Sequence, residues 1–404
     1  MNVLMDTVET MGGITAPQGF RAAGVACGLK PDGRDIMLLV ADRVCSVAGV
    51  FTTNVVKAAP VLYCSKRVKA GRAQAVVINS GVANACTGDE GMRRCEQMAW
   101  QVAQSTGLAE ELTLVCSTGV IGRQLPMEKI VAGIEKAARV LSPKGGHDAA
   151  LAIMTTDTRP KEFAVTLETE QGTVRMGGMA KGSGMIAPNM ATMLSVITTD
   201  AQIDPEPLRV ALQNAVNRSF NRVTVDGDTS TNDTVLLLAN GMTGIRLQQG
   251  TQDFARFERA LCQVTEVLAK MVASDGEGAT KLVEVWVHGA ADDAAATTIA
   301  KTIANSPLVK TALFGNDPNW GRILAAAGRA GVPFDPNRVD LDLAGIPVVR
   351  AGQPVAFDKA EASAALKTDA VVIALTLDGG TGESLVWTCD FSYDYVKINA
   401  DYTT

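Results

Sequence analysis

The chain has 404 residues, a length typical of about two domains, and 47% of them are hydrophobic, which is enough for a sizeable core. Its formal net charge of −6 excludes the broad basic surface that nucleic acids or anionic membranes attract. There is no apolar run of about 18 residues, which excludes a transmembrane helix of the usual length. The first residues carry two acids and no basic segment, so we expect no secretory signal and a cytoplasmic protein.

Apolar runs and helical spacing predict a mixture of strands and helices in the first half of the chain. Gly107 follows an apolar pattern at helical spacing over 92–102 and predicts the end of that helix. Pro126 predicts the first turn of another helix over 126–140. The expected strands are 36–40, 47–51, 75–78, 112–116, 163–168, 173–178 and 193–197.

The second half alternates more plainly between the two kinds of element. We expect helices over 205–217, 253–273, 290–305 and 320–330. The expected strands are 235–238, 282–288, 309–314, 339–343 and 371–377, and the tail 395–404 also has strand character. The elements do not follow a strict βαβ order, so the pattern predicts an α/β or α+β fold with two interlocked parts.

Cysteine and histidine usage limits the available chemistry. The eight cysteines include no CxxC pair and most lie in apolar runs, which is typical of reduced, buried thiols. There are two histidines, His147 and His288, and neither lies near a cysteine pair, so we expect no metal site. We expect structural or surface roles for both, which leaves no histidine for a Ser-His-Asp triad.

Two glycine-rich segments imitate known motifs but fail on their context. Ser183 lies between Gly182 and Gly184, but its wider surroundings do not match the nucleophile elbow GxSxG. The segment 276–281 resembles a phosphate-binding loop, yet a strand is expected after it where a phosphate loop needs a helix. No dinucleotide-binding fingerprint occurs, so no nicotinamide cofactor is implied.

One hydroxyl remains as a candidate nucleophile, that of Thr192 in the stretch 181–194 (KGSGMIAPNMATML). A threonine hydroxyl needs a base, and the threonine's own α-amine serves if the Ala191–Thr192 bond is cut. A free α-amine has a pKa of about 7.7–8.0, so a useful fraction is unprotonated near neutral pH. The alternative is that Thr192 is an ordinary β-branched residue at the start of a strand.

Acyl transfer also requires donors for the oxyanion, and Thr118-Gly119 follows a predicted buried strand. This pair supplies a hydroxyl and a backbone N–H, although a Thr-Gly turn is also a common structural feature. Glu277 lies in a loop of small residues, where it is either a ligand for a cation or a solvated turn acid.

With these residues in place, the sequence resembles the ornithine acetyltransferase family of arginine biosynthesis, the bifunctional glutamate N-acetyltransferases or ArgJ family. The resemblance extends over nearly the whole chain in family order. The motifs that carry it are 13–24 (GITAPQGFRAAG), 48–54 (AGVFTTN), 79–88 (NSGVANACTG), 117–122 (STGVIG), 154–158 (MTTDT), 181–194, 226–234 (DGDTSTNDT), 275–281 (DGEGATK), 314–323 (FGNDPNWGRI) and 398–404 (INADYTT).

The resemblance implies self-cleavage between Ala191 and Thr192, giving an α chain 1–191 and a β chain 192–404. It implies a mixed α/β architecture of the N-terminal-threonine type, with a catalytic domain (1–280) shared by both fragments and a C-terminal domain (281–404). It also implies an α₂β₂ heterotetramer. No cofactor is implied.

The activity that the resemblance implies is a ping-pong transfer of acetyl from N-acetylornithine to glutamate through acetyl-Thr192. Thr118 and Gly119 are implied as the oxyanion hole. The implied substrate ligands are Thr155, Lys181, Thr192, Glu277, Asn399 and Thr404. Thr156 is identical to its neighbour, so the register at Thr155 stays open. An α-carboxylate suits Lys181, and the side-chain ammonium of ornithine suits Glu277.

Three alternatives stay open at this point. Some family members also accept acetyl-CoA as the donor whereas others only recycle acetyl, and we favour the bifunctional form. An N-terminal-nucleophile amidase or aminopeptidase would share the nucleophile but use water as the acceptor. An uncleaved binding or scaffold protein would use Thr192 only to start a strand.

Overall fold

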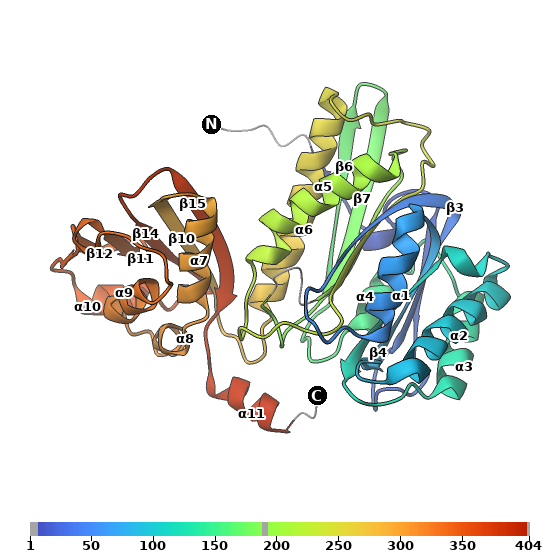
Figure 1. Ribbon diagram of the computed structural model, residues 1–404, viewed down its shortest axis with the longest axis horizontal. Helices are drawn as coiled ribbons and strands as arrows, with labels where there is room; N and C mark the ends of the chain where they lie inside the picture. Colours follow the sequence, from blue (N-terminus) through green and yellow to red (C-terminus); the bar gives the residue numbers. More distant parts are fainter. Residues whose placement is uncertain (1–6, 188–192, 402–404) are drawn as a thin grey trace.

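The computed structural model describes residues 7–187 and 193–401, which are arranged in two parts (Figure 1). The larger part is built around an extended sheet with helices packed against it, and the smaller part around a second sheet. The chain passes into the smaller part after a long helix, α6 (Gln252–Ser274), and returns toward the larger part through α11 (Tyr393–Asp401).

Nine strands of the described residues form the larger sheet. They pair in the order β1-β6-β7-β8-β9-β3-β4-β5, and β2 pairs with β3 beside this path. The strands are β1 (Thr7–Glu9), β2 (Phe20–Val25), β3 (Ile36–Phe51), β4 (Arg72–Val82), β5 (Thr113–Val120), β6 (Lys161–Thr169), β7 (Gly172–Lys181), β8 (Leu194–Thr199) and β9 (Thr234–Ala239).

Apolar side chains cover both faces of this sheet. Along β9, Leu236 and Leu238 join one core cluster, whereas the alternate residues Val235 and Leu237 join another. Because successive side chains of a strand point to opposite faces, the two clusters lie on opposite sides of the sheet. The run of β9 is therefore continuously apolar, as expected for a strand that is buried on both faces.

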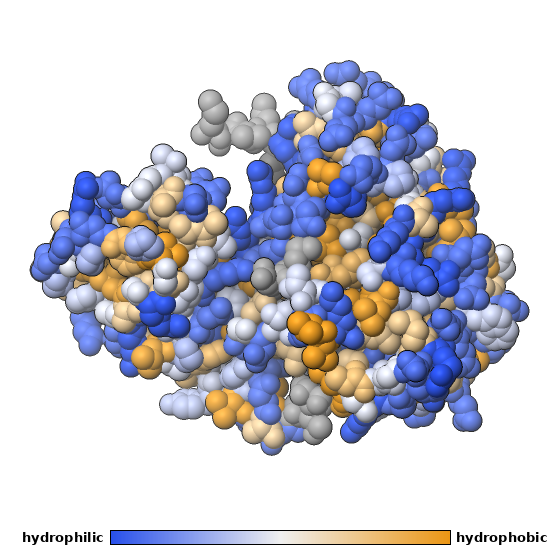
Figure 2. Space-filling view, in the orientation of Figure 1, coloured by the Kyte–Doolittle hydropathy of each residue, from blue (hydrophilic) through white to orange (hydrophobic). Residues whose placement is uncertain are grey.

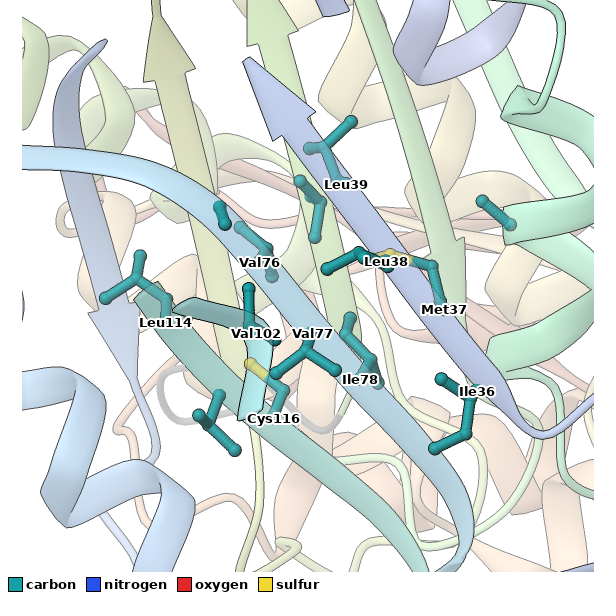
Figure 3. Close-up of a cluster of buried hydrophobic side chains, with 14 of the residues drawn as sticks. Ile36, Met37, Leu38, Leu39, Val76, Val77, Ile78, Val102, Leu114 and Cys116 are labelled. Carbon is teal, nitrogen blue, oxygen red and sulfur yellow. The ribbon is translucent and has the colours of Figure 1, made fainter. Parts of the chain in front are cut away.

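Helices close each of these two cores. The first cluster lies beneath α1 (Ala59–Arg67), α2 (Gly88–Thr106), α3 (Met127–Arg139) and α4 (Gly146–Ile153). Figure 3 shows its centre, where side chains of β3, β4 and β5 meet Val102 of α2. The second cluster lies beneath α5 (Pro205–Arg218) and α6, which pack against each other and against the sheet.

The smaller part has its own core and a six-stranded sheet within the described residues. Its order is β13-β12-β11-β14-β10-β15. The strands are β10 (Leu282–Ala290), β11 (Asp340–Leu343), β12 (Ile346–Arg350), β13 (Gln353–Pro354), β14 (Ala370–Thr376) and β15 (Gly382–Cys389). The helices are α7 (Asp293–Ala304), α8 (Pro307–Phe314), α9 (Trp320–Gly328) and α10 (Lys359–Ala365).

Three sequence-based predictions of secondary structure are wrong. The expected strand 309–314 is helix α8, which starts with Pro307 at its first turn. The expected strand at the tail is helix α11 over its described residues. The two short strands expected at 36–40 and 47–51 are one strand, β3, whose register shifts between Val40 and Cys45.

Most of the other expected elements are present with shifts of a few residues at their ends. The helices expected over 126–140, 205–217 and 253–273 correspond to α3, α5 and α6. Three helices were not expected at all, α1, α4 and α10. Helix α4 contains His147.

The surface agrees with the composition of the chain. On the face shown in Figure 2, hydrophilic and apolar residues are interspersed. No helix within residues 7–187 or 193–401 combines the length and the apolar character needed to cross a membrane. All eight cysteines are free thiols, five of them buried, while Cys86 is exposed.

Candidate active site

A polar cavity of about 240 Å³ collects side chains from both sides of the predicted cleavage point. It lies between the end of β5, the loop after α4, the end of β7, the 226–232 loop, the 275–281 loop and α11. The predicted site residues that line it are Thr118, Gly119, Thr155, Lys181, Glu277 and Asn399. The other predicted residues, Ala191, Thr192 and Thr404, lie outside the described residues.

Lys181 and Thr118 both line this cavity and contact each other. The Lys181 Nζ donates a hydrogen bond to Thr118 Oγ1 at 3.3 Å, and both side chains are more than nine-tenths buried. Because the Thr118 oxygen accepts this bond from a cation, its own proton is left for an acceptor in the cavity. The pair therefore combines a positive charge with a polarised hydroxyl donor.

The charge of Lys181 is balanced by its surroundings. Burial lowers the pKa of the Lys181 ammonium below its ordinary value, whereas the carboxylate of Asp157 raises it. The charge of Lys161 also lowers this pKa, and Asp233 and Glu277 raise it. Lys181 is thus a cation whose charge depends on neighbouring carboxylates.

Gly119 needs to be a glycine for two reasons. Its φ of +127° is a conformation that other residues rarely adopt. A Cβ at this position would also lie 2.3 Å from the backbone carbon of Gly81 on β4. The close approach of β4 and β5 brings the Thr118-Gly119 backbone to the cavity wall.

Glu277 is fixed from three directions. Its backbone N–H donates to the Ser183 carbonyl at 2.9 Å, and Asn399 Nδ2 donates to its Oε2 at 2.8 Å. The carboxyl group also packs so close to Gly184 that a Cβ there would lie 2.4–2.5 Å from it. Glu277 is 7% exposed, so it is not the solvated turn acid of the alternative interpretation.

Thr155 and Thr156 both line the cavity, but they make different hydrogen bonds. The Thr156 Oγ1 lies 2.7 Å from Ser183 Oγ and shares a hydrogen bond with it. The Thr155 backbone N–H donates to Asp157 Oδ2 at 2.9 Å, which fixes the loop. The hydroxyl of Thr156 is therefore engaged within the protein.

The structure adds residues that the sequence did not single out. Asn232 Nδ2 donates to the carbonyls of Ala83 and Ser117, at 2.6 and 2.8 Å, and joins the 226–232 loop to the ends of β4 and β5. Asp226 accepts from the backbone N–H groups of Met185 and Ile186. Both residues lie in the DGDTSTNDT motif at 226–234. The presence of acidic and amide side chains among several hydroxyls in this motif was the sequence feature that could have identified them.

Tyr395 of α11 also lines the cavity. Burial, together with nearby carboxylates, raises the pKa of its phenol to about 12, so it is a neutral hydroxyl near pH 7. It was not found from the sequence because the tail was interpreted as a strand.

Neither histidine lines this cavity. His147 lies on α4 and contacts Glu162 of β6 through its Nδ1. His288 lies on β10 of the smaller part. Among the described residues, no three His, Cys, Asp or Glu side chains are grouped as metal ligands. The nearby 275–281 loop leads into strand β10, as expected, and not into a helix.

The fold and this cavity define a mixed α/β protein with a partly open polar site of about 240 Å³, which suits a small ligand. The sequence model of the ArgJ family matches residues 21–404 of this chain. The chain is 54% identical over 397 residues to the arginine biosynthesis bifunctional protein ArgJ of Symbiobacterium thermophilum, covering 97% of this chain and 99% of that protein. It is 51% identical over 414 residues to the protein of the same name from Thermosynechococcus vestitus, covering 98% and 99%.

A solved structure of arginine biosynthesis bifunctional protein argJ from Bacillus halodurans is similar as well. Its sequence is 47% identical, and the match covers 52% of this chain and 100% of the solved chain with a TM-score of 0.51. This chain belongs to the ArgJ family.

Proposed function

We propose that the protein transfers the acetyl group of N²-acetyl-L-ornithine to L-glutamate, giving ornithine and N-acetylglutamate, as a glutamate N-acetyltransferase of arginine biosynthesis. The observation that carries the proposal is the cavity in which Thr118, Lys181 and Glu277 converge, in a member of the ArgJ family. It offers a cation, a hydroxyl donor and a carboxylate to one small ligand.

Maturation by cleavage between Ala191 and Thr192 belongs to the proposal. Lys181 at the end of β7 pairs with Leu194 at the start of β8, so the cleavage point lies in the connection between two paired strands. Cutting that connection leaves the strand ladder intact. The share of this chain that the solved relative covers, 52%, is close to that of a fragment 192–404, which has 213 of the 404 residues, about 53%.

In the first half-reaction, the Thr192 hydroxyl attacks the acetyl carbonyl carbon while the Thr192 α-amine takes its proton. The oxyanion that forms accepts hydrogen bonds from the Thr118 hydroxyl and the Gly119 N–H. The C–N bond to ornithine then breaks, and the proton passes from the α-ammonium to the leaving amine. Acetyl-Thr192 and ornithine are the products.

In the second half-reaction, the amine of glutamate attacks the acetyl-threonine ester. The same two donors stabilise the second oxyanion, and the Thr192 hydroxyl leaves with the proton that the glutamate amine releases. N-acetylglutamate departs and the free threonine returns. Since the donors and the base serve both halves, one site is sufficient for a ping-pong route.

Substrate orientation follows from charge. The α-carboxylate of N-acetylornithine lies against Lys181, and its side-chain ammonium lies against Glu277. Asn399 contacts the Glu277 carboxylate and so orients it. We assign Thr155 as a further ligand, together with Thr404, because within residues 7–187 and 193–401 the Thr156 hydroxyl bonds to Ser183 whereas the Thr155 hydroxyl has no such bond.

The finer properties are proposals of the same kind. We propose acetyl-CoA as a second acetyl donor, because curated relatives are named bifunctional. A cavity of about 240 Å³ admits the thioester end and leaves the body of the coenzyme outside. We also propose an α₂β₂ assembly, a cytoplasmic location, and the division into a catalytic domain 1–280 and a C-terminal domain 281–404.

The direct test is to incubate the purified protein with N-acetylornithine and glutamate and to quantify both products. We expect ornithine and N-acetylglutamate in equal amounts. Acetate without N-acetylglutamate would instead identify an amidase and overturn the proposal. A parallel reaction with acetyl-CoA and glutamate tests the second donor separately, because its failure leaves the ornithine-dependent transfer standing.

A further inference from the structure

A fully buried lysine, Lys161, lies outside the set of residues that line the cavity. The Lys161 side chain on β6 is 0% exposed, and its Nζ contacts two buried carboxylates. One is Asp157 Oδ1 at 2.6 Å, and the other is Asp275 Oδ2. A buried cation with a single partner is costly, whereas two carboxylates with further hydrogen bonds satisfy it.

Both carboxylates also hold backbone that leads to the cavity. Asp157 accepts from the Gly182 N–H at 2.7 Å, next to Lys181, and from the Thr155 N–H at 2.9 Å. Asp275 accepts from the Thr158 N–H at 3.1 Å and lies two residues before Glu277. The buried cluster thus connects the segments that carry three of the proposed substrate ligands.

The cluster also crosses the proposed cleavage point in sequence. Asp157 and Lys161 precede residue 191, whereas Asp275 follows it. After cleavage these groups belong to different fragments and are joined only by non-covalent contacts. This ion cluster is therefore one of the contacts that hold the Glu277 segment to the Lys181 segment across the two fragments, together with the bond from the Glu277 N–H to the Ser183 carbonyl.

Asp157 has an electrostatic role in addition. Burial alone raises the pKa of its carboxyl, but the charges of Lys161 and Lys181 outweigh burial and hold the pKa below its ordinary value. Asp157 is thus an anion beside Lys181. The charged groups that face Lys181 are Lys30, Asp157, Lys161, Asp233 and Glu277.

We propose that Asp157 is a positioning residue for acetyl transfer: it orients Thr155 and Lys181, keeps Lys181 positively charged, and is linked through Lys161 and Asp275 to the loop of Glu277. The inference rests on the proposed function and deepens it. Asp157 touches no substrate, so its effect passes through the residues that do.

The informative pair of variants is Asp157→Asn and Asp275→Asn. Each leaves Lys161 one carboxylate, so both perturb the buried cluster to a similar extent. Only Asp157→Asn removes the anion beside Lys181, and its amide offers a single acceptor oxygen where the two carboxylate oxygens accept from Thr155 and Gly182. For this variant we expect the KM for N-acetylornithine to rise roughly 10- to 100-fold, with a smaller change in kcat.

The pH dependence gives the second readout. Lys181 binds a carboxylate only when it is protonated, so substrate binding is lost as the pH rises through its pKa. Without the Asp157 charge this pKa falls, and the rise of KM begins at a lower pH in Asp157→Asn than in the wild type. Asp275→Asn is expected to keep the wild-type pH profile, because Asp275 does not face Lys181.

Trace labelling of Lys181 with acetic anhydride, quantified by peptide mass spectrometry over a pH series, reports the same pKa without turnover. A wild-type protein that transfers no acetyl would refute the proposed function but leave this comparison intact. Identical labelling profiles and KM values for wild type and Asp157→Asn would overturn the positioning role. Should Asp157→Asn fail to fold, Asp157→Glu keeps the charge and displaces the contacts, and an unchanged KM there would also overturn it.

Discussion

Gly184 carries no side chain, and the Glu277 carboxyl group occupies the space beside its Cα. A β-carbon at this position would come within 2.4–2.5 Å of three Glu277 atoms. The position of one carboxylate in the cavity therefore depends on a missing methyl group on a different segment. The glycines at 182 and 184 are noticeable in the sequence, but the side chain that lies against Gly184 is known only from the structure.

We expect Gly184→Ala to displace Glu277 and to raise the KM for N-acetylornithine roughly 10- to 100-fold, the range for losing one charge-assisted contact. Steady-state kinetics with purified protein measure this. Gly328→Ala is the matched control, since nothing lies within 4 Å of its added Cβ and it ends helix α9. Equal KM values for the two variants would contradict the role of Gly184.

Two threonines on the same strand allow the Thr118 hydroxyl to be tested against a purely structural one. We expect Thr118→Val to lower kcat by roughly 100- to 1000-fold, as the loss of an oxyanion donor does. Thr113 is fully buried at the start of β5, and its hydroxyl has no hydrogen-bond partner within the described part of the chain.

Thr113→Val removes that unpartnered hydroxyl and keeps the shape of the side chain. We expect it to raise the free energy of unfolding by about 1 kcal/mol and to leave kcat unchanged. Denaturant unfolding and kinetics on both variants measure this contrast. A similar loss of kcat in both would show that valine damages the strand and does not report on the oxyanion.

At the scale of elements, α11 returns the end of the chain to a cavity that the larger part forms. None of its described residues is buried, and it reaches the site through Tyr395 and Asn399. The segment 393–401 contains Tyr, Val and Ile, which favour strands in isolation. Docking of the segment beside the 275–281 loop prevails over that local preference.

We expect Asn399→Ala to raise the KM for N-acetylornithine by roughly 10-fold, because Glu277 loses the amide that orients it. Val396→Ala, on the same helix and 67% exposed, should change neither KM nor melting temperature. Kinetics and thermal unfolding of both variants give the answer. A KM near the wild-type value for Asn399→Ala would remove α11 from the site.

Local patterns predicted elements well where one physical signal dominated. Apolar spacing located α5 and α6, Pro126 located the start of α3, and continuous apolar runs located β5, β8 and β9. The prediction failed for α8. The mostly apolar segment 309–314 was interpreted as a strand, but it includes a buried lysine, Lys310, whose Nζ donates hydrogen bonds to Thr388 and to the Cys389 carbonyl on β15. Hydrogen bonds between a buried charge and residues that are distant in sequence cannot be predicted from a local sequence pattern.

At the scale of the whole molecule, the larger sheet alternates between segments before and after residue 191. Strands β8 and β9 lie between β7 on one side and β3 on the other. The proposed cut therefore falls within a single sheet whose central strands belong to the second fragment. Separating the fragments would break both ladders and expose both cores.

We accordingly expect the cleaved fragments to elute together from a native size-exclusion column and to separate only in denaturant. The two fragments are held together by strand pairing. Residues 176–181 of β7 pair with β8, and residues 46–51 of β3 pair with β9. Gel analysis of the native peak measures it. Fragments that part under native conditions would contradict the described sheet.

Family motifs in the sequence singled out six of the residues that line the cavity, but they could not show how these residues meet. Spacing along the chain does not reveal that Asp157 and Asp275, more than a hundred residues apart, share Lys161. Nor does it show that the Lys181 ammonium bonds to the Thr118 hydroxyl. These contacts depend on the order of strands in the sheet, which is a property of the whole fold.

The measurement that tests the central claim most directly is the intact mass of the purified protein under denaturing conditions, with N-terminal sequencing. The account predicts two fragments, the second beginning Thr192-Met193-Leu194, and a single unbroken chain without activity for Thr192→Ala. An unbroken wild-type chain that still transfers acetyl would contradict it, because Thr192 would then lack the free α-amine that activates its hydroxyl.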